Sequence, residues 1–316
     1  NHTNPNAATI RVGTRRSPLA LWQAQHVSDA LERRWKGTVK CELVEVVTEG
    51  DKILDRPLNE VGGKGLFVNA IEEKLLSGDV DIAVHSMKDL PSKLPEGLVI
   101  GCTPKREDPR DAICGPEGIR IGRLPAGLKI GTSSLRRSAL IRRLNPEVEI
   151  VPIRGNVQTR LRKFEEAEVD AVVLAAAGLH RLGLEDRITE YLDVERFCPA
   201  ACQGILGVEC REDDARTRSL LAPLSDRWAS IATAAERAFL ETLDGGCQVP
   251  MGCYAEVRSE TIMTVAGVIV DPRGRPCFIA TRAGEPEAAA RLGKDLATSL
   301  AGLGGAKVLE SLRTSA

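Results

Sequence analysis

The chain has 316 residues, with 43 basic and 44 acidic side chains and a formal net charge of −1. Its 43% hydrophobic and 28% charged content is ordinary for a globular protein, which disfavours disorder and nucleic-acid binding over the whole surface. The length predicts two or three domains. No run of about 18 apolar residues occurs, and the first residues lack a basic-then-apolar signal, so we expect a soluble, cytoplasmic protein without a membrane partner.

The nine cysteines are scattered along the chain and form no Cys-x-x-Cys pair. An odd number of cysteines in a chain of this length favours reduced thiols over a disulfide framework. With four histidines in all, a zinc site has little support, and we predict no metal.

The N-terminal part alternates between strand and helix patterns. We predict a strand over residues 10–13, a helix from Ser17-Pro18, a β-rich segment over 39–47, a helix that ends at Gly78 and a strand over 80–84. Residues 48–64 are polar and contain several glycines, which predicts a long loop.

Two short patterns recur further along the chain. Lys129-Ile-Gly-Thr is similar to Arg11-Val-Gly-Thr, and Glu168-Val-Asp-Ala-Val-Val is similar to Asp79-Val-Asp-Ile-Ala-Val. The repetition predicts two related α/β lobes, with parallel sheets because strands alternate with helices. Coincidence is the alternative, since strand-glycine-helix turns are common.

The C-terminal part has a different pattern. We predict a helix around residues 231–239 that stops at Asp244-Gly-Gly, strands over 261–270 and 277–281, and a closing helix over 286–303. This order predicts a separate small α+β domain.

Basic residues are concentrated in the segment 129–163, which has nine cations against two anions. Seven of the nine are arginines, and this favours forked recognition of carboxylate or phosphate groups. A solvated helix face is the alternative, above all for Arg142, Arg143 and Arg162. Few aromatic residues accompany these cations, and Leu66 stands where a phosphate loop needs Ser or Thr, so a small polyacid fits better than a nucleic acid or a nucleotide.

Two further residues are candidates for chemistry. Asp89 follows the predicted strand 80–84, where ligands meet an α/β sheet, and a carboxylate there can stabilise a developing cation. The alternative is an Asp that opens a turn before Pro91. Cys247 lies in a glycine-rich loop that makes a thiol accessible, although most cysteines are small buried hydrophobes.

Seven segments, in order along the chain, resemble the motifs of one family. They are Arg11-Val-Gly-Thr-Arg-Arg-Ser-Pro-Leu-Ala-Leu-Trp-Gln-Ala, Gly62-Gly-Lys-Gly-Leu-Phe, His85-Ser-Met-Lys-Asp-Leu-Pro, Arg106-Glu-Asp-Pro-Arg-Asp-Ala, Gly131-Thr-Ser-Ser-Leu-Arg-Arg, Arg154-Gly-Asn-Val-Gln-Thr-Arg and Gly245-Gly-Cys-Gln-Val-Pro. Each motif is weak alone, but all of them in order are specific. Over residues 10–303 the chain closely resembles the porphobilinogen deaminases, also called hydroxymethylbilane synthases.

The resemblance implies a fold and a reaction. The fold is α/β, with two related lobes like those of bilobal binding proteins that face a cleft, plus a smaller α+β C-terminal domain that carries the cofactor cysteine. By this likeness, residues 1–104 and 205–221 form the first lobe, 105–204 the second and 222–316 the C-terminal domain. The enzyme is a transferase of tetrapyrrole (haem) biosynthesis, which releases ammonia from four porphobilinogen molecules and joins them into hydroxymethylbilane. The primer is a dipyrromethane bound as a thioether.

The resemblance also assigns site residues. Asp89 with Lys88 is catalytic, and Cys247 holds the cofactor. Further cofactor-binding residues are Lys64, Ser86, Asp89, Ser133, Ser134, Arg136, Arg137, Arg160 and Arg181. Substrate-binding residues are Arg15, Ser17, Gln23, Phe67, Arg154, Arg160 and Arg181. The acetate and propionate groups of the growing chain then account for the excess of arginine.

One position departs from the family pattern, because Cys202 stands where glycine is usual, which leaves the backbone geometry there open. Two other classes of function compete with the enzyme. A bilobal binding protein for a small polyacid would use the same arginines without chemistry, and an RNA-binding protein is a weaker third. We expect a monomer that binds porphobilinogen and no nucleic acid.

Overall fold

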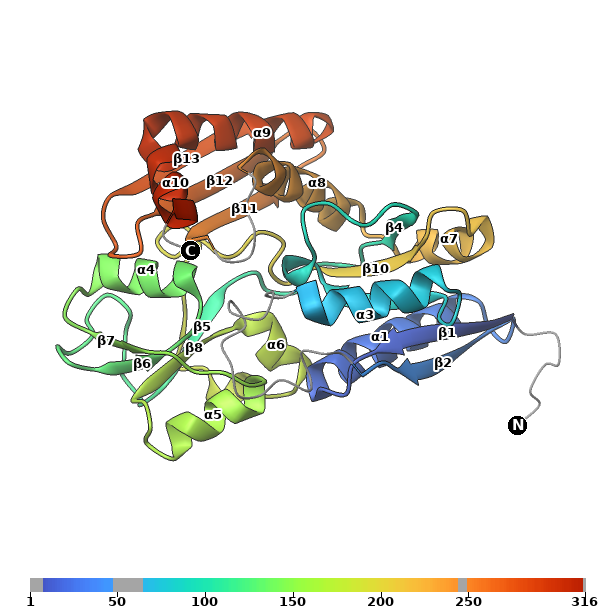
Figure 1. Cartoon of the computed structure of the whole chain (residues 1–316), viewed down its shortest axis with the longest axis horizontal. Helices are drawn as coiled ribbons and strands as arrows, with labels where there is room; N and C mark the ends of the chain where they lie inside the picture. Colours follow the sequence, from blue (N-terminus) through green and yellow to red (C-terminus); the bar gives the residue numbers. More distant parts are fainter. Residues whose placement is uncertain (1–7, 48–64, 244–248, 315–316) are drawn as a thin grey trace. The chain divides into compact units, whose positions relative to one another are not determined.

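The computed structural model describes residues 8–47, 65–243 and 249–314, with side chains omitted at 65–69. The chain divides into two compact units, Asn1–Arg106 with Ile205–Ser230, and Glu107–Gly204 with Ile231–Ala316. Each unit contains one five-stranded sheet, and the second also contains a three-stranded sheet (Figure 1).

The first lobe is built on the sheet β2-β1-β3-β10-β4. Its strands are β1 (Ala8–Thr14), β2 (Val39–Glu45), β3 (Ile82–Ser86), β4 (Leu98–Cys102) and β10 (Leu206–Arg211). β1 pairs in parallel with β2 and β3, whereas β10 runs antiparallel to both β3 and β4. Its helices are α1 (Pro18–Arg34), α3 (Gly65–Leu76) and α7 (Ala215–Leu221).

Helices cover both faces of this first sheet. The Ser17 Oγ caps α1 by accepting from the Ala20 N–H, and Pro18 fits the first helical position. α1 then buries a stripe that includes Val27 and Leu31 against one face of the sheet. On the other face, α3 buries Leu75 with Ala83 and Leu98.

The second lobe repeats this arrangement in the sheet β7-β6-β8-β5-β9. Its strands are β5 (Asp111–Cys114), β6 (Lys129–Gly131), β7 (Glu149–Val151), β8 (Ala171–Ala175) and β9 (Glu190–Tyr191). β6 pairs in parallel with β7 and β8, and β5 runs antiparallel to β8 and β9. Its helices are α4 (Leu135–Leu144), α5 (Val157–Glu165) and α6 (Ala176–Arg181). The shared strand order confirms two related α/β lobes.

The C-terminal domain has an antiparallel sheet in the order β11-β12-β13, as the α+β prediction requires. Its elements are α8 (Arg227–Thr242), β11 (Met251–Val257), β12 (Met263–Val270), β13 (Cys277–Gly284), α9 (Ala289–Leu300) and α10 (Ala306–Thr314). α9 packs across β12 and β13 (Figure 1). Phe239 and Leu296 meet over Gly267, where a Cβ atom would lie 2.9 Å from the Phe239 ring.

The expectation of wholly parallel sheets is wrong. β5 and β10 each follow a connection from the other lobe that contains no crossover helix. Each enters its sheet antiparallel to the neighbouring strand, β8 for β5 and β3 for β10. Only the strands joined by helices within one lobe are parallel. Element ends also differ by a few residues: the strand predicted over 80–84 lies at Ile82–Ser86, and the helix predicted over 286–303 is α9 (Ala289–Leu300), with α10 (Ala306–Thr314) beyond the predicted range.

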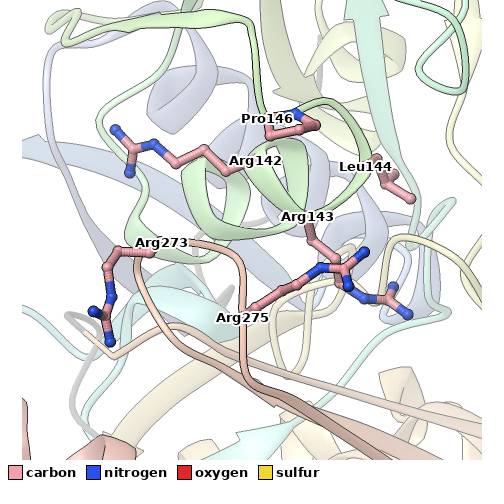
Figure 2. A pocket seen from close by; sticks show the side chains of 6 residues that line it. All are labelled: Arg142, Arg143, Leu144, Pro146, Arg273 and Arg275. Carbon is pink, nitrogen blue, oxygen red and sulfur yellow. The ribbon is translucent and has the colours of Figure 1, made fainter.

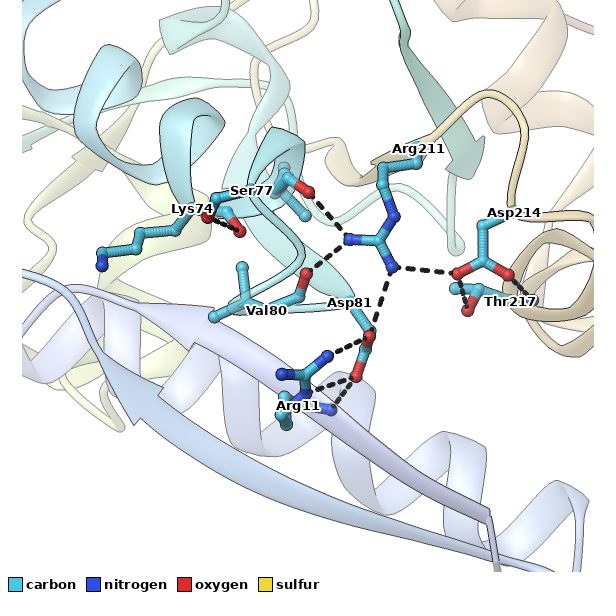
Figure 3. A network of polar contacts seen from close by, with 9 residues as sticks. Arg11, Lys74, Ser77, Val80, Asp81, Arg211, Asp214 and Thr217 are labelled. Carbon is cyan, nitrogen blue, oxygen red and sulfur yellow. Dashed lines mark hydrogen bonds and ion pairs between the residues drawn. The ribbon is translucent and has the colours of Figure 1, made fainter.

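An ionic network fixes the far end of β10 in the first lobe. Arg211 donates to the carbonyl oxygens of Leu75 and Val80, at 2.8 Å each, and to the carboxylates of Asp81 and Asp214 (Figure 3). From β1, Arg11 donates two hydrogen bonds to the Asp81 carboxylate, through Nε and Nη2. Burial raises the pKa of Asp81, but the hydrogen bonds from Arg11 and Arg211 outweigh it and the net shift is downward.

Cys202 adopts a left-handed backbone conformation with φ of 62°. This region of φ favours glycine, because a residue with a Cβ atom is strained there. The departure from the family pattern therefore falls at a strained backbone position. The residue is buried, and its N–H donates to the Glu236 carboxylate in α8. The backbone therefore keeps the glycine-type conformation although the side chain is cysteine.

Candidate active site

In the first lobe, candidate residues gather where parallel strands end. Arg15 and Ser17 follow β1, while Ser86, Lys88 and Asp89 follow or end β3. Because β1 and β3 are parallel neighbours, their carboxyl ends lie at the same edge of the sheet. Arg15, Lys88 and Asp89 are all half-buried there. The prediction that Asp89 follows the carboxyl end of a strand is confirmed.

Asp89 ends a short 3₁₀ turn, Met87–Asp89, which is held from two directions. The Met87 N–H donates to the Ile205 carbonyl oxygen at 2.9 Å. Beside it, the buried Gln23 side chain of α1 donates from Nε2 to the Ser86 Oγ at 3.0 Å. The two predicted polar residues, Gln23 and Ser86, thus contact each other and fix the base of the turn.

The second lobe gathers candidates at the equivalent edge. Ser133 and Ser134 follow β6, Arg154 follows β7, and α6 with Arg181 follows β8. These three strands are parallel neighbours, so their carboxyl ends share one edge. Arg160 lies on α5, where its Nε donates to the Gly155 carbonyl oxygen at 2.9 Å. The predicted cations therefore lie around one end of this sheet.

The serines have local partners. The Ser134 Oγ caps α4 by accepting from the Arg137 N–H at 3.2 Å, and the Ser133 Oγ donates to the Ile153 carbonyl oxygen at 2.6 Å. Ser133 is exposed. The start of α4 presents N–H groups, which favours an anion at that end of the helix.

Arg181 is the most buried of the candidate substrate-binding arginines, at 8% exposure. Within the described residues, its hydrogen bond goes from Nη2 to the Gly204 carbonyl oxygen at 2.8 Å. Burial lowers the pKa of Arg181 to about 10, against the opposite effect of the Glu107 charge. A guanidinium group has five donors, so Arg181 retains the capacity to bind a carboxylate.

Arg136 and Arg137 share one buried carboxylate, which the sequence interpretation missed. Arg136 donates to Asp111 at 2.6 Å and to the Cys198 carbonyl oxygen at 2.8 Å, and the Arg137 Nε donates to Asp111 at 2.9 Å. Gln203 adds a longer bond to the same carboxylate. Asp111 lies in the Arg106-Glu-Asp-Pro-Arg-Asp-Ala motif. An acidic residue at the start of an apolar strand is the feature of the sequence from which a buried ion pair could have been predicted.

The other end of α4 carries Arg142 and Arg143, which line a pocket of about 470 Å3 with Arg273 and Arg275 (Figure 2). The guanidinium groups of Arg143 and Arg275 point to one side of the pocket, and those of Arg142 and Arg273 to the other. Arg142 donates to the Pro272 carbonyl oxygen. Cations are favoured in the last turn of a helix, so the alternative of a helix-face role fits Arg142 and Arg143.

Three predicted site residues have side chains outside the described part of the chain. Lys64 and Cys247 lie in the omitted segments, and Phe67 belongs to α3 with its backbone alone described. Within the described ranges, no cluster of His, Cys, Asp or Glu is arranged to hold a metal ion. In the same ranges, no helix is long and apolar enough to cross a membrane.

Two family models match this chain, and together they cover most of its length. The model of the porphobilinogen deaminase dipyrromethane cofactor binding domain matches residues 10–219, and the model of the porphobilinogen deaminase C-terminal domain matches residues 230–302. The chain belongs to the porphobilinogen deaminase family.

Bacterial porphobilinogen deaminases are similar over nearly their whole length. The enzyme of Syntrophobacter fumaroxidans is 52% identical over 96% of this chain and 97% of its own length. That of Syntrophotalea carbinolica is 50% identical over 97% of both chains, and that of Brevibacillus brevis is 47% identical over 95% of this chain and 96% of its own.

Membership decides between the classes of function that the sequence leaves open. The chain is a transferase that polymerises porphobilinogen in tetrapyrrole biosynthesis, with a dipyrromethane cofactor. A binding protein without chemistry is therefore not supported.

The second lobe fits a cofactor of this kind. A dipyrromethane carries several carboxylates, and the second lobe places the buried Arg181 and the N-terminus of α4 at one sheet edge. Both features favour anions, so the residues present suit the group.

Proposed function

We propose that Asp89 is the catalytic carboxylate of porphobilinogen polymerisation. The observation that carries this proposal is its position: it ends the turn after β3, at the ligand edge of the sheet, and neighbouring hydrogen bonds fix that turn. When porphobilinogen loses ammonia, positive charge develops over its pyrrole ring and the ring N–H becomes more acidic. A carboxylate that accepts from this N–H stabilises the charge.

Lys88 is the second proposed catalytic residue. It lies in the same turn as Asp89 and is half-buried with it. An ammonium group at this position is able to pair with an acid group of the substrate. Its cationic charge also opposes full transfer of the pyrrole proton to Asp89.

Cys247 is the proposed attachment residue for the dipyrromethane, which supplies the growing end to which porphobilinogen units are added. The support is the Gly245-Gly-Cys-Gln-Val-Pro motif and the match to the family. A thiolate is a soft nucleophile and forms a thioether with an electrophilic carbon.

The remaining candidates are proposed to bind the acidic side chains of cofactor and substrate. Arg181, Arg154 and Arg160 are proposed to bind carboxylates directly, because they surround one sheet edge. The same proposal covers Arg15, Ser17, Gln23, Lys64, Phe67, Ser86, Ser133, Ser134, Arg136 and Arg137. Arg136 and Arg137 already share Asp111, so their contribution to acid binding uses the donors that this pairing leaves.

We further propose that the protein is a cytoplasmic monomer that binds no nucleic acid. Cys41, Cys102, Cys114, Cys210 and Cys277 are thiols, which suits a reducing compartment. A net charge of −1 gives no general attraction for nucleic acid.

Substitution of Asp89 tests the proposed function. Asp89→Asn keeps the size of the side chain and removes its charge, and we expect turnover to fall by about two to four orders of magnitude while the protein still folds and carries its cofactor. Single-turnover kinetics and intact mass are the measurements. Asp29→Asn, at an exposed site on α1, is the matched control. Turnover within a few-fold of the unaltered enzyme would remove Asp89 from the catalytic role.

A further inference from the structure

The C-terminal end of α4 and the turn that joins β12 to β13 border a pocket that the proposed function does not use (Figure 2). Its volume is about 470 Å3. Four arginines, one leucine and one proline line it, namely Arg142, Arg143, Arg273, Arg275, Leu144 and Pro146. Ser134 caps the opposite end of this ten-residue helix, about 15 Å away. The pocket is therefore separate from the sheet edge where the second lobe gathers its candidate residues.

Close backbone packing fixes the turn against α4. The Arg142 Nη1 donates to the Pro272 carbonyl oxygen at 3.0 Å. Gly274 has a φ of 92°, and a Cβ atom there would lie 2.6 Å from the backbone nitrogen of Arg143. Glycine is therefore needed both for the conformation of the turn and for its approach to the helix. The fold itself brings the four arginines together.

The arginines of the pocket are only partly neutralised. Asp271, which is 7% exposed, accepts from the Arg273 Nε at 2.8 Å. Within residues 8–47, 65–243 and 249–314, no hydrogen bond or ion pair engages the side chains of Arg143 and Arg275. One carboxylate thus pairs with one of four guanidinium groups. Like charges held together repel one another, so an anion that binds between them is favoured.

The end of α4 does not balance this charge. A helix C-terminus carries about half of a negative elementary charge, which favours Arg142 and Arg143 in the last turn. Together with the carboxylate of Asp271, it leaves at least about two positive charges of the four arginines unbalanced. A ligand with two or more negative charges would restore the balance.

The arrangement of the guanidinium groups indicates the chemistry of such a ligand. Figure 2 shows two pairs, with Arg143 and Arg275 to one side and Arg142 and Arg273 to the other. Guanidinium groups bind carboxylate and phosphate oxygens through two parallel hydrogen bonds. A pocket of this volume suits a small molecule rather than a polymer. A small molecule with an anionic group at each end fits both pairs.

We propose that this pocket binds a small molecule that carries two or more carboxylate or phosphate groups. One anionic group pairs with Arg143 and Arg275, and a second pairs with Arg142 and Arg273. Occupancy joins α4 to the β12–β13 turn and thereby stabilises that unit of the chain against unfolding. The inference goes beyond the proposed function and does not depend on the proposed catalytic residues.

Calorimetric titration of the holoenzyme with inorganic pyrophosphate and with citrate tests the proposal. We expect a saturable component whose affinity falls about tenfold or more when Arg143→Gln and Arg275→Gln are combined. The control combines Arg258→Gln and Arg291→Gln, which remove the same charge from exposed sites of the same unit, and should change the affinity less than about twofold. Tighter binding of pyrophosphate would assign the site to phosphate groups, and tighter binding of citrate would assign it to carboxylate groups.

The candidate active site is also rich in arginine, so the location of the bound probe is measured separately. Phenylglyoxal modifies guanidinium groups, and peptide mapping identifies the arginines that a probe protects. We expect a saturating probe to slow the modification of Arg143 and Arg275 about fivefold or more and to leave Arg258 unchanged. The pocket variant should keep kcat and KM for porphobilinogen within about twofold.

Three results would overturn the proposal. The first is the absence of a saturable component below about 10 mM for both probes. The second is an equal loss of affinity in the pocket variant and in the control, because nonspecific attraction of charge would then account for the binding. The third is protection confined to arginines at the sheet edges of the two lobes, which would assign the probe to the candidate active site.

Discussion

In the second lobe, Asp111 is fully buried and is bound by two arginines and a glutamine, whereas in the first lobe Glu209 is equally buried and is bound by His85. The second lobe therefore surrounds one acid with a surplus of permanent cations. The first lobe pairs its acid with the imidazole of His85, and burial and the charge of Glu209 raise the pKa of a second acid, Glu72, to about 7. Of these buried acids, Glu72 is therefore the one whose charge we expect to change with pH in the neutral range.

The largest effect is expected from removing the acid of the second lobe. Asp111→Ala leaves Arg136 and Arg137 buried without their carboxylate, and breaking a buried ion pair from one side costs about 3–5 kcal/mol. Urea unfolding monitored by circular dichroism measures this loss. Glu117→Gln, at an exposed site in the same lobe, is the control and should be neutral. A loss below about 1 kcal/mol would mean that the two arginines find other partners.

A smaller effect, expressed through pH, is expected in the first lobe. The pKa of Glu72 is raised in the folded protein from its ordinary 4.5 to about 7, so the folded state holds this proton more tightly. Its contribution to stability is fully present below about pH 4.5 and is lost as pH rises through about 7, a change of up to about 3 kcal/mol. The free energy of unfolding of the unaltered protein should therefore fall between about pH 5 and about pH 8.

Glu72→Gln sharpens this comparison between the lobes. The variant should lack the Glu72 component of the pH dependence, while Glu117→Gln in the second lobe should retain it. Parallel curves for Glu72→Gln and the unaltered protein would show that Glu72 titrates normally, and the contrast between the lobes would then disappear.

The sequence predicts much of the first-lobe site because its signals are local. Ser17-Pro18 marks the start of α1, and the apolar strand before Ser86 places Asp89 at the ligand edge. The cations of the second lobe are found from their concentration in residues 129–163, and the structure shows that Ser134 and Asn156 cap the helices beside them.

Long-range pairing could not be predicted in this way. His85 and Glu209 come together only because β10 returns to the first sheet beside β3, in the antiparallel direction, and that direction has no local signal. The Asp111 pairing likewise depends on β5 entering the second sheet beside β8. The strand β9 has two residues and is too short to be recognised from the sequence. The strand β11 follows a glycine-rich segment, and its pattern is too irregular to be recognised.

The most direct test of the central claim is the intact denatured mass of the purified protein, with peptide mapping around Cys247. The proposed function predicts an adduct of two pyrrole units joined to Cys247 through a thioether, and no such adduct in Cys247→Ser. If the protein is purified without the adduct, incubation with porphobilinogen should add it. An unmodified Cys247 after this incubation, or an adduct on another residue, would contradict the assignment of Cys247 as the attachment residue.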